Sequence, residues 1–148
     1  MSSVRPVTRQ DAAAWLAMRQ ALWPDDPGGS HAKEIEEFFA GRLRMPLQVL
    51  VAVDESRVVG FAELSIRAYA EGCLTDRVAF LEGWYVEPEA RRRGFGRALV
   101  SAAEEWGRGQ GCSEFGSDAL LNNDISAAAH QALGFEEVVR IRCFKKEL

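Results

Sequence analysis

The sequence predicts a mixed α/β domain, because stretches of strand length alternate with stretches that carry a helical stripe. Residues 58–67 alternate apolar and polar side chains, as expected of a strand. Residues 78–86 form a second, more apolar run of strand length that ends before Pro88. A glycine-bearing turn then leads into a helical stripe formed by Leu99, Ala102, Ala103 and Trp106. Strand, glycine turn and helix thus follow one another in the middle of the chain.

The N-terminal half contains signals for a strand, two helices and a hairpin. Pro24 ends the first helix, and a breaker-rich acidic loop separates it from the second. A short polar turn joins the two strands of the hairpin. The predicted elements are a strand at 4–7, helices at 11–23 and 31–43, and strands at 47–53 and 58–67.

The C-terminal half continues the alternation of strands and helices. The central strand at 78–86 precedes the helix with the stripe described above. A strand near 113–118 follows, then a helix whose apolar positions run from Ile125 to Leu133. An alternating segment at 138–146 predicts a final strand.

Length, composition and charge narrow the possible functions. The 148 residues suffice for one core, so we expect residues 1–148 to form a single domain. A formal net charge of −4 argues against nucleic acid and favours a cationic partner. No apolar run is long enough for a membrane span and no signal-peptide core is present, which predicts a cytoplasmic protein without a membrane partner. Three cysteines without CxxC spacing indicate reduced thiols and no metal site.

The turn at residues 91–96 has the composition of a phosphate-binding site. It contains three arginines and two glycines and lies where a helix begins, so free N–H groups and the helix dipole favour an anion. Gly94 and Gly96 are expected to let the backbone approach a ligand closely. A dinucleotide fingerprint is excluded because Leu99 occupies its third glycine position, and the chain lacks the Gly-Lys-Ser/Thr of a P-loop.

This turn resembles the acyl-CoA pyrophosphate loop of the GNAT N-acetyltransferase superfamily. Two further motifs match in order: Asn122-Asn123 before the last helix, and Leu133-Gly134-Phe135 after it. The resemblance implies acetyl-CoA as cosubstrate, no metal, and a mixed, largely antiparallel sheet with helices on both faces. It implies that the pantetheine arm lies along the backbone of the central strand and that the pyrophosphate binds the turn. The cofactor-binding residues implied in this way are Trp84, Tyr85, Val86, Arg91, Arg92, Arg93, Gly94, Phe95, Gly96, Arg97 and Asn123.

Some of these residues have a simpler explanation. The side chains of Trp84 and Tyr85 can be plain core aromatics, which leaves the prediction about their backbone unaffected. Asn123 can be a helix N-cap, and a cap is compatible with cofactor binding.

Two carboxylates are candidates for chemistry. Glu82 interrupts an apolar strand, so it is either paired with a structural cation or faces a site. Desolvation raises the pKa of such a carboxyl toward that of a general base, so we assign Glu82 the catalytic role. Asp118 follows the next strand and is the second candidate, with an ordinary loop or cap aspartate as the alternative.

Over almost its whole length the chain is similar to the aminoglycoside 6'-N-acetyltransferases. The matching motifs are Trp23-Pro24, Phe80–Gly83, Ser117-Asp118 and His130–Glu136. This resemblance implies a polycationic acceptor acetylated on its 6'-amine within a ternary complex, and it implies a homodimer, as in many relatives. It further implies that Glu82 and Asp118 hold the ammonium groups of the acceptor. Trp23 and Tyr69 would line the acceptor pocket.

The chain departs from the family at the general acid. His130 and Phe144 stand where relatives can place a tyrosine, and we interpret His130 as a packed helix residue. A thiol with a pKa of about 8.5 can leave largely unassisted near neutral pH. Two other functions stay open: a GNAT enzyme for another small amine or a protein N-terminus, and a non-catalytic sensor that binds acyl-CoA.

Overall fold

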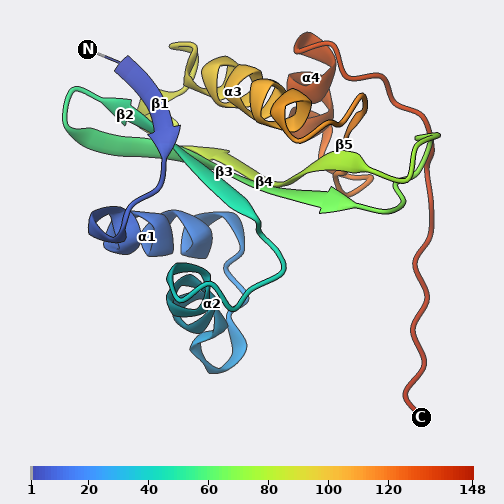
Figure 1. The fold of residues 1–148 in the computed structure, drawn as a ribbon, viewed down its shortest axis with the longest axis horizontal. Coiled ribbons are helices and arrows are strands. Elements are labelled where there is room, and N and C mark those ends of the chain that lie inside the picture. Colours follow the sequence, from blue (N-terminus) through green and yellow to red (C-terminus); the bar gives the residue numbers. More distant parts are fainter. Residues whose placement is uncertain (1) are drawn as a thin grey trace.

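The computed structural model describes residues 2–148, whose five strands form one sheet in the order β1-β2-β3-β4-β5 (Figure 1). The first four strands pair antiparallel, and β4 pairs with β5 in parallel. The predicted mixed, largely antiparallel sheet is therefore confirmed. The strands are β1 (Ser2–Pro6), β2 (Gln48–Asp54), β3 (Arg57–Arg67), β4 (Val78–Val86) and β5 (Phe115–Ser117).

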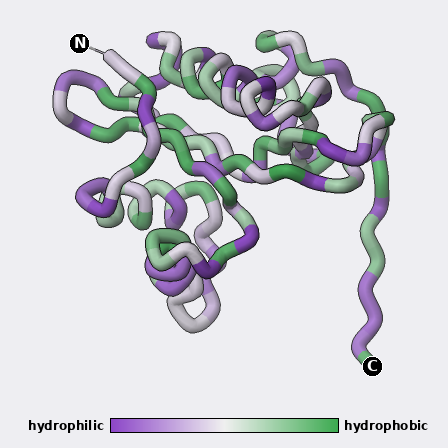
Figure 2. Tube along the Cα trace, viewed as in Figure 1, coloured by the Kyte–Doolittle hydropathy of each residue, from purple (hydrophilic) through white to green (hydrophobic). Residues whose placement is uncertain are grey.

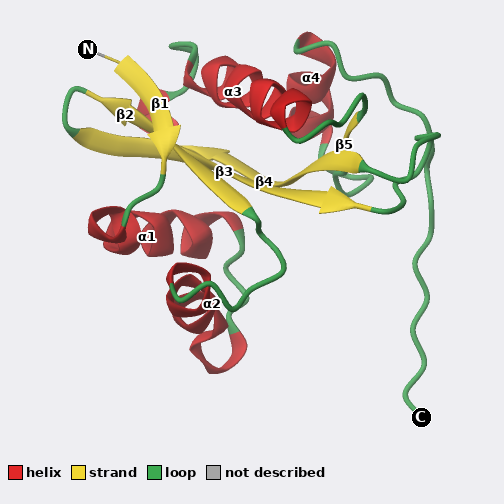
Figure 3. Cartoon of the chain, viewed as in Figure 1, coloured by secondary structure: helices red, strands yellow, loops and turns green. Residues whose placement is uncertain are grey.

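Helices cover both faces of the sheet, as predicted (Figure 3). On one face lie α1 (Ala12–Leu22) and α2 (Ser30–Phe39), and on the other lie α3 (Phe95–Gly109) and α4 (Asp124–Ala132). Three short 3₁₀ turns complete the chain: η1 (Arg9–Asp11), η2 (Pro27–Gly29) and η3 (Pro88–Ala90). None of the helices within residues 2–148 is both long and apolar enough to cross a membrane.

The two faces of the sheet pack into separate apolar cores, and β2 contributes to both. Its alternate residues Val49 and Val51 lie in the core beneath α1 and α2, whereas Leu50 and Ala52 lie in the core beneath α3. Figure 2 shows hydrophobic residues concentrated along the strands. A strand covered on both faces is apolar throughout, which explains the unbroken run predicted at 47–53.

The ends of several elements differ from the prediction. Helix α2 ends at Phe39 and not at Leu43, because Gly41 takes a left-handed conformation with φ of +74°. Strand β5 has three residues, fewer than the predicted 113–118. The stripe expected to bury α4 is largely exposed, and Ile125 is 85% exposed.

The predicted final strand at 138–146 is wrong. Residues 137–148 form an exposed tail without helix or strand, which runs away from the sheet (Figure 1). Near its start, the side chain of Val138 lies against Gly72 in the β3–β4 loop, where a Cβ on Gly72 would approach within 2.4 Å. The tail therefore passes the β3–β4 loop and finds no strand partner within residues 2–148 of its own chain.

Candidate active site

The candidate active site lies where β4 and β5 separate. Their parallel pairing ends at Leu81 and Ser117, whereas on its other side β4 stays paired with β3 as far as Val86. From Gly83 to Val86, β4 therefore has one edge without a strand partner among the described residues. Such an edge offers N–H and C=O groups to an extended ligand, in the manner of an added strand. This arrangement is compatible with the predicted path of a pantetheine arm.

A β-bulge places Glu82 at the start of this open edge. Glu63 pairs with Gly83 and Leu64 pairs with Leu81, so Glu82 is the extra residue on β4. Bulges redirect a side chain and are frequent beside active sites.

The carboxylate of Glu82 is held by Arg67, which the sequence analysis did not identify. Arg67 donates from Nε and Nη2 to Oε2 at 3.2 and 2.8 Å, and its Nη2 also contacts Oε1. The guanidinium lies over the Phe80 ring, 3.7 Å from its centroid. Of the two alternatives for Glu82, pairing with a cation is confirmed. The side chain is still 14% exposed, so a ligand can reach it.

The turn before α3 has the geometry predicted for an anion site. Arg92 and Gly94 are left-handed, with φ of +62° and +89°. The first bond of the helix runs from Ala98 N to Gly94 O at 3.0 Å, so the amides at 95–97 precede it and lack partners within the helix. Glycine is favoured at position 94 by this left-handed backbone and not by lack of space, because a Cβ there would meet nothing within 4 Å. At Gly96 a Cβ would lie 3.2 Å from the Trp84 ring, so this glycine makes room for that side chain.

The arginines of this turn lie on the surface and are partly engaged by the protein. Arg93 forms an ion pair with Asp54 at 2.9 Å, and Arg91 donates from Nε to the carbonyl of Val86 at 2.8 Å. Beside them, a shallow hollow is lined by residues 93–95 and by β1. The turn thus combines free amides, positive charge and an accessible surface.

The aromatic side chains of Trp84 and Tyr85 pack inside the protein. Trp84 meets the His130 ring edge-on with centroids 5.4 Å apart, and Tyr85 lies 6.2 Å from Phe61. Burial and then the charge of Glu87 raise the pKa of Tyr85, so its phenol stays protonated. Both side chains are half-buried, and Trp84 packs against the core beneath α3 whereas Tyr85 packs against the core beneath α1 and α2. One group is unmatched: the buried Nε1 of Trp84 has no hydrogen-bond partner within residues 2–148.

On the far side of the open edge, His130 connects α4 to the end of β5. Its Nδ1 lies 2.7 Å from the carbonyl of Ser126 and must donate to it, so Nε2 accepts from the Ser117 hydroxyl at 2.7 Å. His130 is therefore a packed, hydrogen-bonded helix residue, as interpreted. The Asn123 Oδ1 accepts from Ser126 N at 3.1 Å, which confirms it as the N-cap of α4.

The residues expected around the acceptor come from separate elements. Trp23 follows α1, and its ring lies against Gly83, where a Cβ would approach within 2.5 Å. Tyr69 is 67% exposed and donates to Glu71 at 3.2 Å, and the charge of Glu71 raises its pKa. Asp118 is exposed and directly follows β5. The structure thus brings Trp23 beside the bulge, whereas among the described residues no hydrogen bond joins Tyr69 or Asp118 to Glu82.

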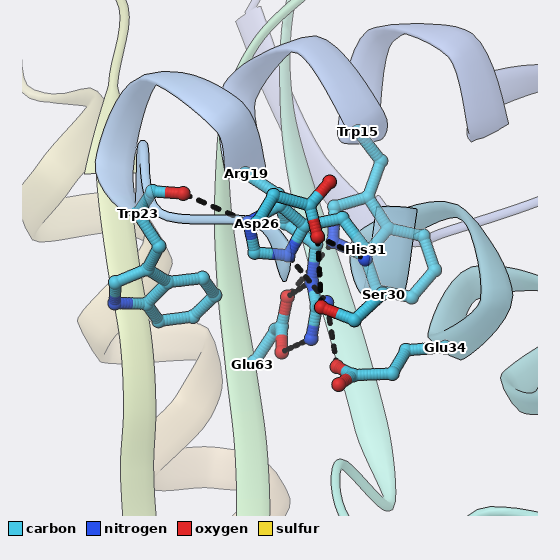
Figure 4. Close-up of polar contacts among 8 residues, drawn as sticks. All are labelled: Trp15, Arg19, Trp23, Asp26, Ser30, His31, Glu34 and Glu63. Carbon is cyan, nitrogen blue, oxygen red and sulfur yellow. Dashed lines mark hydrogen bonds and ion pairs between the residues drawn. The ribbon is translucent and has the colours of Figure 1, made fainter. Parts of the chain in front are cut away.

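A buried polar network beneath Trp23 was not predicted (Figure 4). It centres on Arg19 and Glu63, which are 4% and 2% exposed, and it includes Trp15, His31 and Glu34. Glu63 alternates with Ala62 and Leu64, a pattern that favours a solvent-facing side chain, but α1 and α2 cover that face of β3. No group of three or more His, Cys, Asp or Glu side chains is placed to bind a metal ion within residues 2–148.

Known proteins that resemble this chain over most of its length are acetyltransferases. A profile of the Acetyltransferase (GNAT) family matches residues 15–135. The aminoglycoside N(6')-acetyltransferase type 1 of Klebsiella aerogenes is 56% identical over 146 residues, which cover 98% of this chain and 96% of that protein. The protein of the same name from Acinetobacter baumannii is 42% identical over 147 residues, which cover 99% of each chain.

Solved structures share the fold as well. AAC(6')-Iy in complex with the bisubstrate analog CoA-S-monomethyl-acetylneamine has a TM-score of 0.91 and 35% identity, covering 100% of this chain and 99% of that one. The 6'-N-acetyltransferase AAC(6')-Ih from Acinetobacter baumannii has a TM-score of 0.89 and 39% identity, again covering 100% and 99%. Because the family profile spans most of the chain and the relatives match it end to end, this protein belongs to the acetyltransferase (GNAT) family.

Proposed function

We propose that this protein transfers the acetyl group of acetyl-CoA to the 6'-amino group of aminoglycosides and so inactivates these antibiotics. The observation that carries the proposal is full-length similarity to aminoglycoside N(6')-acetyltransferases, up to 56% identity. AAC(6')-Iy, whose fold matches with a TM-score of 0.91, binds an analog that combines CoA with an acetylated aminoglycoside. The alternatives, an enzyme for an unrelated amine and a non-catalytic sensor, are not favoured by these relatives.

The residues present fit acetyl-CoA. The open edge of β4 at 83–86 suits an extended pantetheine arm, and the free amides at 95–97 suit a pyrophosphate. Arg91, Arg92, Arg93 and Arg97 supply positive charge around these amides. The unpartnered Nε1 of Trp84, close to Gly96, is the kind of buried donor that a bound acceptor atom would satisfy. Asn123 uses Oδ1 as a cap, which leaves its Nδ2 to donate to the arm.

When bound, acetyl-CoA supplies an activated thioester as the acetyl donor. The chain must hold an unprotonated amine about 3 Å from the thioester carbonyl and accept the proton that the amine loses. Glu82 is the proposed base, acting directly or through a water molecule. A carboxylate offers about four lone-pair sites, so Glu82 can keep Arg67 and still receive a ligand ammonium group.

The acceptor site is proposed to lie around Glu82, with Trp23 as its aromatic wall. The contact of the Trp23 ring with Gly83, the residue after Glu82, supports this. Asp118 and Tyr69 complete the site from the ends of β5 and β3, where both side chains are exposed. A substrate with several ammonium groups suits carboxylates at these positions.

We infer that residues 1–148 act as one domain in the cytoplasm. The single sheet, which contributes to both apolar cores, supports the inference of one domain. The cytoplasmic location is supported by Cys73, Cys112 and Cys143, none of which forms a disulfide, as expected of a reducing compartment.

A homodimer is proposed from the tail at 137–148 and the surface near it. Phe144 and Ile141 of the tail are 90% and 49% exposed, and α4 has no fully buried residue. Apolar Val139, Ile141 and Cys143 alternate with arginines, which is the pattern of a strand with one buried face. An extended segment without a partner in its own chain can add to the sheet of a second copy.

The proposed function is tested with a matched pair of aminoglycosides. Neomycin and paromomycin differ only at position 6', where neomycin has an amine and paromomycin a hydroxyl. Thiol release and a mono-acetylated product are expected with neomycin and not with paromomycin. Equal acetylation of both would place the reaction on another amine, and tight acetyl-CoA binding without turnover on either would favour the sensor.

Glu82→Gln keeps the shape of the side chain and removes its charge. We expect kcat/KM for neomycin to fall at least about tenfold, or about 1.4 kcal/mol, with retained affinity for acetyl-CoA. If Glu82 is the base, the deficit in kcat shrinks as pH rises, because the amine then deprotonates by itself. If Glu82 only binds charge, the deficit stays constant.

Arg67→Gln is the matched control, because it removes the other half of the ion pair. Activity lost equally in both variants, together with an equal loss of thermal stability, would show that Glu82 serves only to neutralise Arg67. Full activity of Glu82→Gln at pH 6.5 would remove Glu82 from catalysis and from acceptor binding.

Deleting residues 139–148 tests the dimer. We expect the full chain to have the mass of a dimer by light scattering and the shortened chain to have the mass of a monomer. A shortened chain that stays dimeric would place the interface elsewhere, and a monomeric full chain would refute the proposed dimer itself.

A further inference from the structure

A buried ion pair joins Arg19 of α1 to Glu63 of β3 beneath Trp23 (Figure 4). Arg19 of α1 donates from Nε and Nη2 to the two carboxylate oxygens of Glu63 on β3, at 2.7 and 2.9 Å. The indole Nε1 of Trp15 donates to the same carboxylate at 2.9 Å. Burial opposes the charge of Arg19, but the hydrogen bonds and charge of Glu63, joined by those of Glu34, raise its pKa. Glu63 therefore accepts three hydrogen bonds from Arg19 and Trp15, with at least one on each carboxylate oxygen.

The remaining nitrogen of the guanidinium points toward α2. Arg19 Nη1 lies 3.1 Å from Nδ1 of His31 and 2.7 Å from Oε2 of Glu34. A guanidinium has only donors, so Nδ1 of His31 must be the acceptor. The ring proton therefore lies on Nε2, which donates to the backbone carbonyl of Trp23 at 2.8 Å. Arg19 thus determines the tautomer of His31, and that tautomer can bond Trp23.

His31 also contacts the side chain of Trp23. The two rings are stacked, with centroids 6.1 Å apart and planes 30° apart, and Arg19 Cζ lies 5.3 Å from the indole. The six-membered ring of the indole lies against Gly83 on β4. Trp23 is thus held between the network and the strand that carries Glu82.

The local chain fixes only the amide of Trp23, which donates to the carbonyl of Arg19 at 2.8 Å, whereas the Trp23 carbonyl is held by His31. Trp23 follows the last residue of α1 with φ of −126° and ψ of 82°, outside the helical region, and precedes Pro24. The loop returns to the network at Asp26, which accepts from the amide of His31 at 2.9 Å and from the hydroxyl of Ser30 at 2.7 Å. These two bonds, the backbone one first, lower the pKa of Asp26. His31 therefore joins the end of α1, the loop and α2 at one point.

We propose that His31 is a positioning residue for acceptor binding: in the tautomer set by Arg19, it fixes the backbone and ring of Trp23 as a rigid wall beside Glu82. This inference rests on the proposed function, because it takes Trp23 to line the aminoglycoside site. A role in core stability alone does not account for the geometry, since Glu63 needs no contribution from His31. One ring nitrogen of His31 accepts from Arg19 and the other donates to Trp23, and neither bonds Glu63.

Two substitutions separate positioning from folding. The amide oxygen and nitrogen of glutamine are spaced like the two ring nitrogens, so His31→Gln can accept from Arg19 and donate to Trp23. His31→Leu can do neither. We expect His31→Leu to raise KM for neomycin about tenfold while KM for acetyl-CoA and kcat change less than about twofold, and His31→Gln to restore most of the loss. An equal rise in both KM values, or no rescue by glutamine, would overturn the proposal.

A double-mutant cycle with Trp23→Ala tests whether His31 acts through Trp23. In that background His31→Leu should have no additional effect on KM for neomycin, whereas additive effects would overturn the proposal. The wild-type protein provides a readout that needs no variant: ¹⁵N NMR should show Nδ1 unprotonated and Nε2 protonated, and the opposite tautomer would contradict the proposal. A wild type that fails to acetylate neomycin would instead refute the proposed function, and with it this role of Trp23.

Discussion

The separation of β4 from β5 after Leu81 and Ser117 is the constraint on which the rest of the structure depends. It leaves a half-buried strand edge at residues 83–86, whose free backbone N–H and C=O groups can bond an extended ligand. The left-handed turn at Arg92 and Gly94 then brings the first amides of α3 to the same end of β4. The strand edge suits an extended pantetheine arm and the helix N-terminus suits the pyrophosphate that follows that arm in coenzyme A.

Strand β3 determines the other half of the site through two of its charged residues. Arg67 holds Glu82 at the bulge, and Glu63 holds Arg19, on which the position of Trp23 depends. The Arg67–Glu82 pair is partly exposed and the Arg19–Glu63 pair is buried, and ion pairs of either kind contribute little net stability because screening or desolvation offsets much of their attraction. Their effect here is on geometry: they fix a carboxylate and an aromatic ring on either side of Gly83, at the point where the acceptor amine is proposed to react.

Periodicity predicted the elements well and their partners poorly. The bounds of β4 follow from its apolar run, and the turn before α3 follows from its glycines and arginines. The ion pair of Arg67 and Glu82 depends on strand register and on a bulge, which no local pattern reports. The burial of Glu63 was not predicted, because alternation shows which residues share a face of a strand, but not whether helices cover that face. The tail at 138–146 has the pattern of a strand, but a strand also requires a pairing partner, and the tail pairs with no strand of residues 2–148.

Hydrogen exchange of the backbone amides, with and without acetyl-CoA, tests the central claim most directly. Saturating acetyl-CoA is expected to slow exchange at residues 83–86 of β4 and at residues 95–97 of α3, and to leave the amides of α1 and α2 nearly unchanged. Protection confined to other segments, or none at β4 despite saturation, would contradict the assignment of the open edge and the helix N-terminus as the acyl-CoA site.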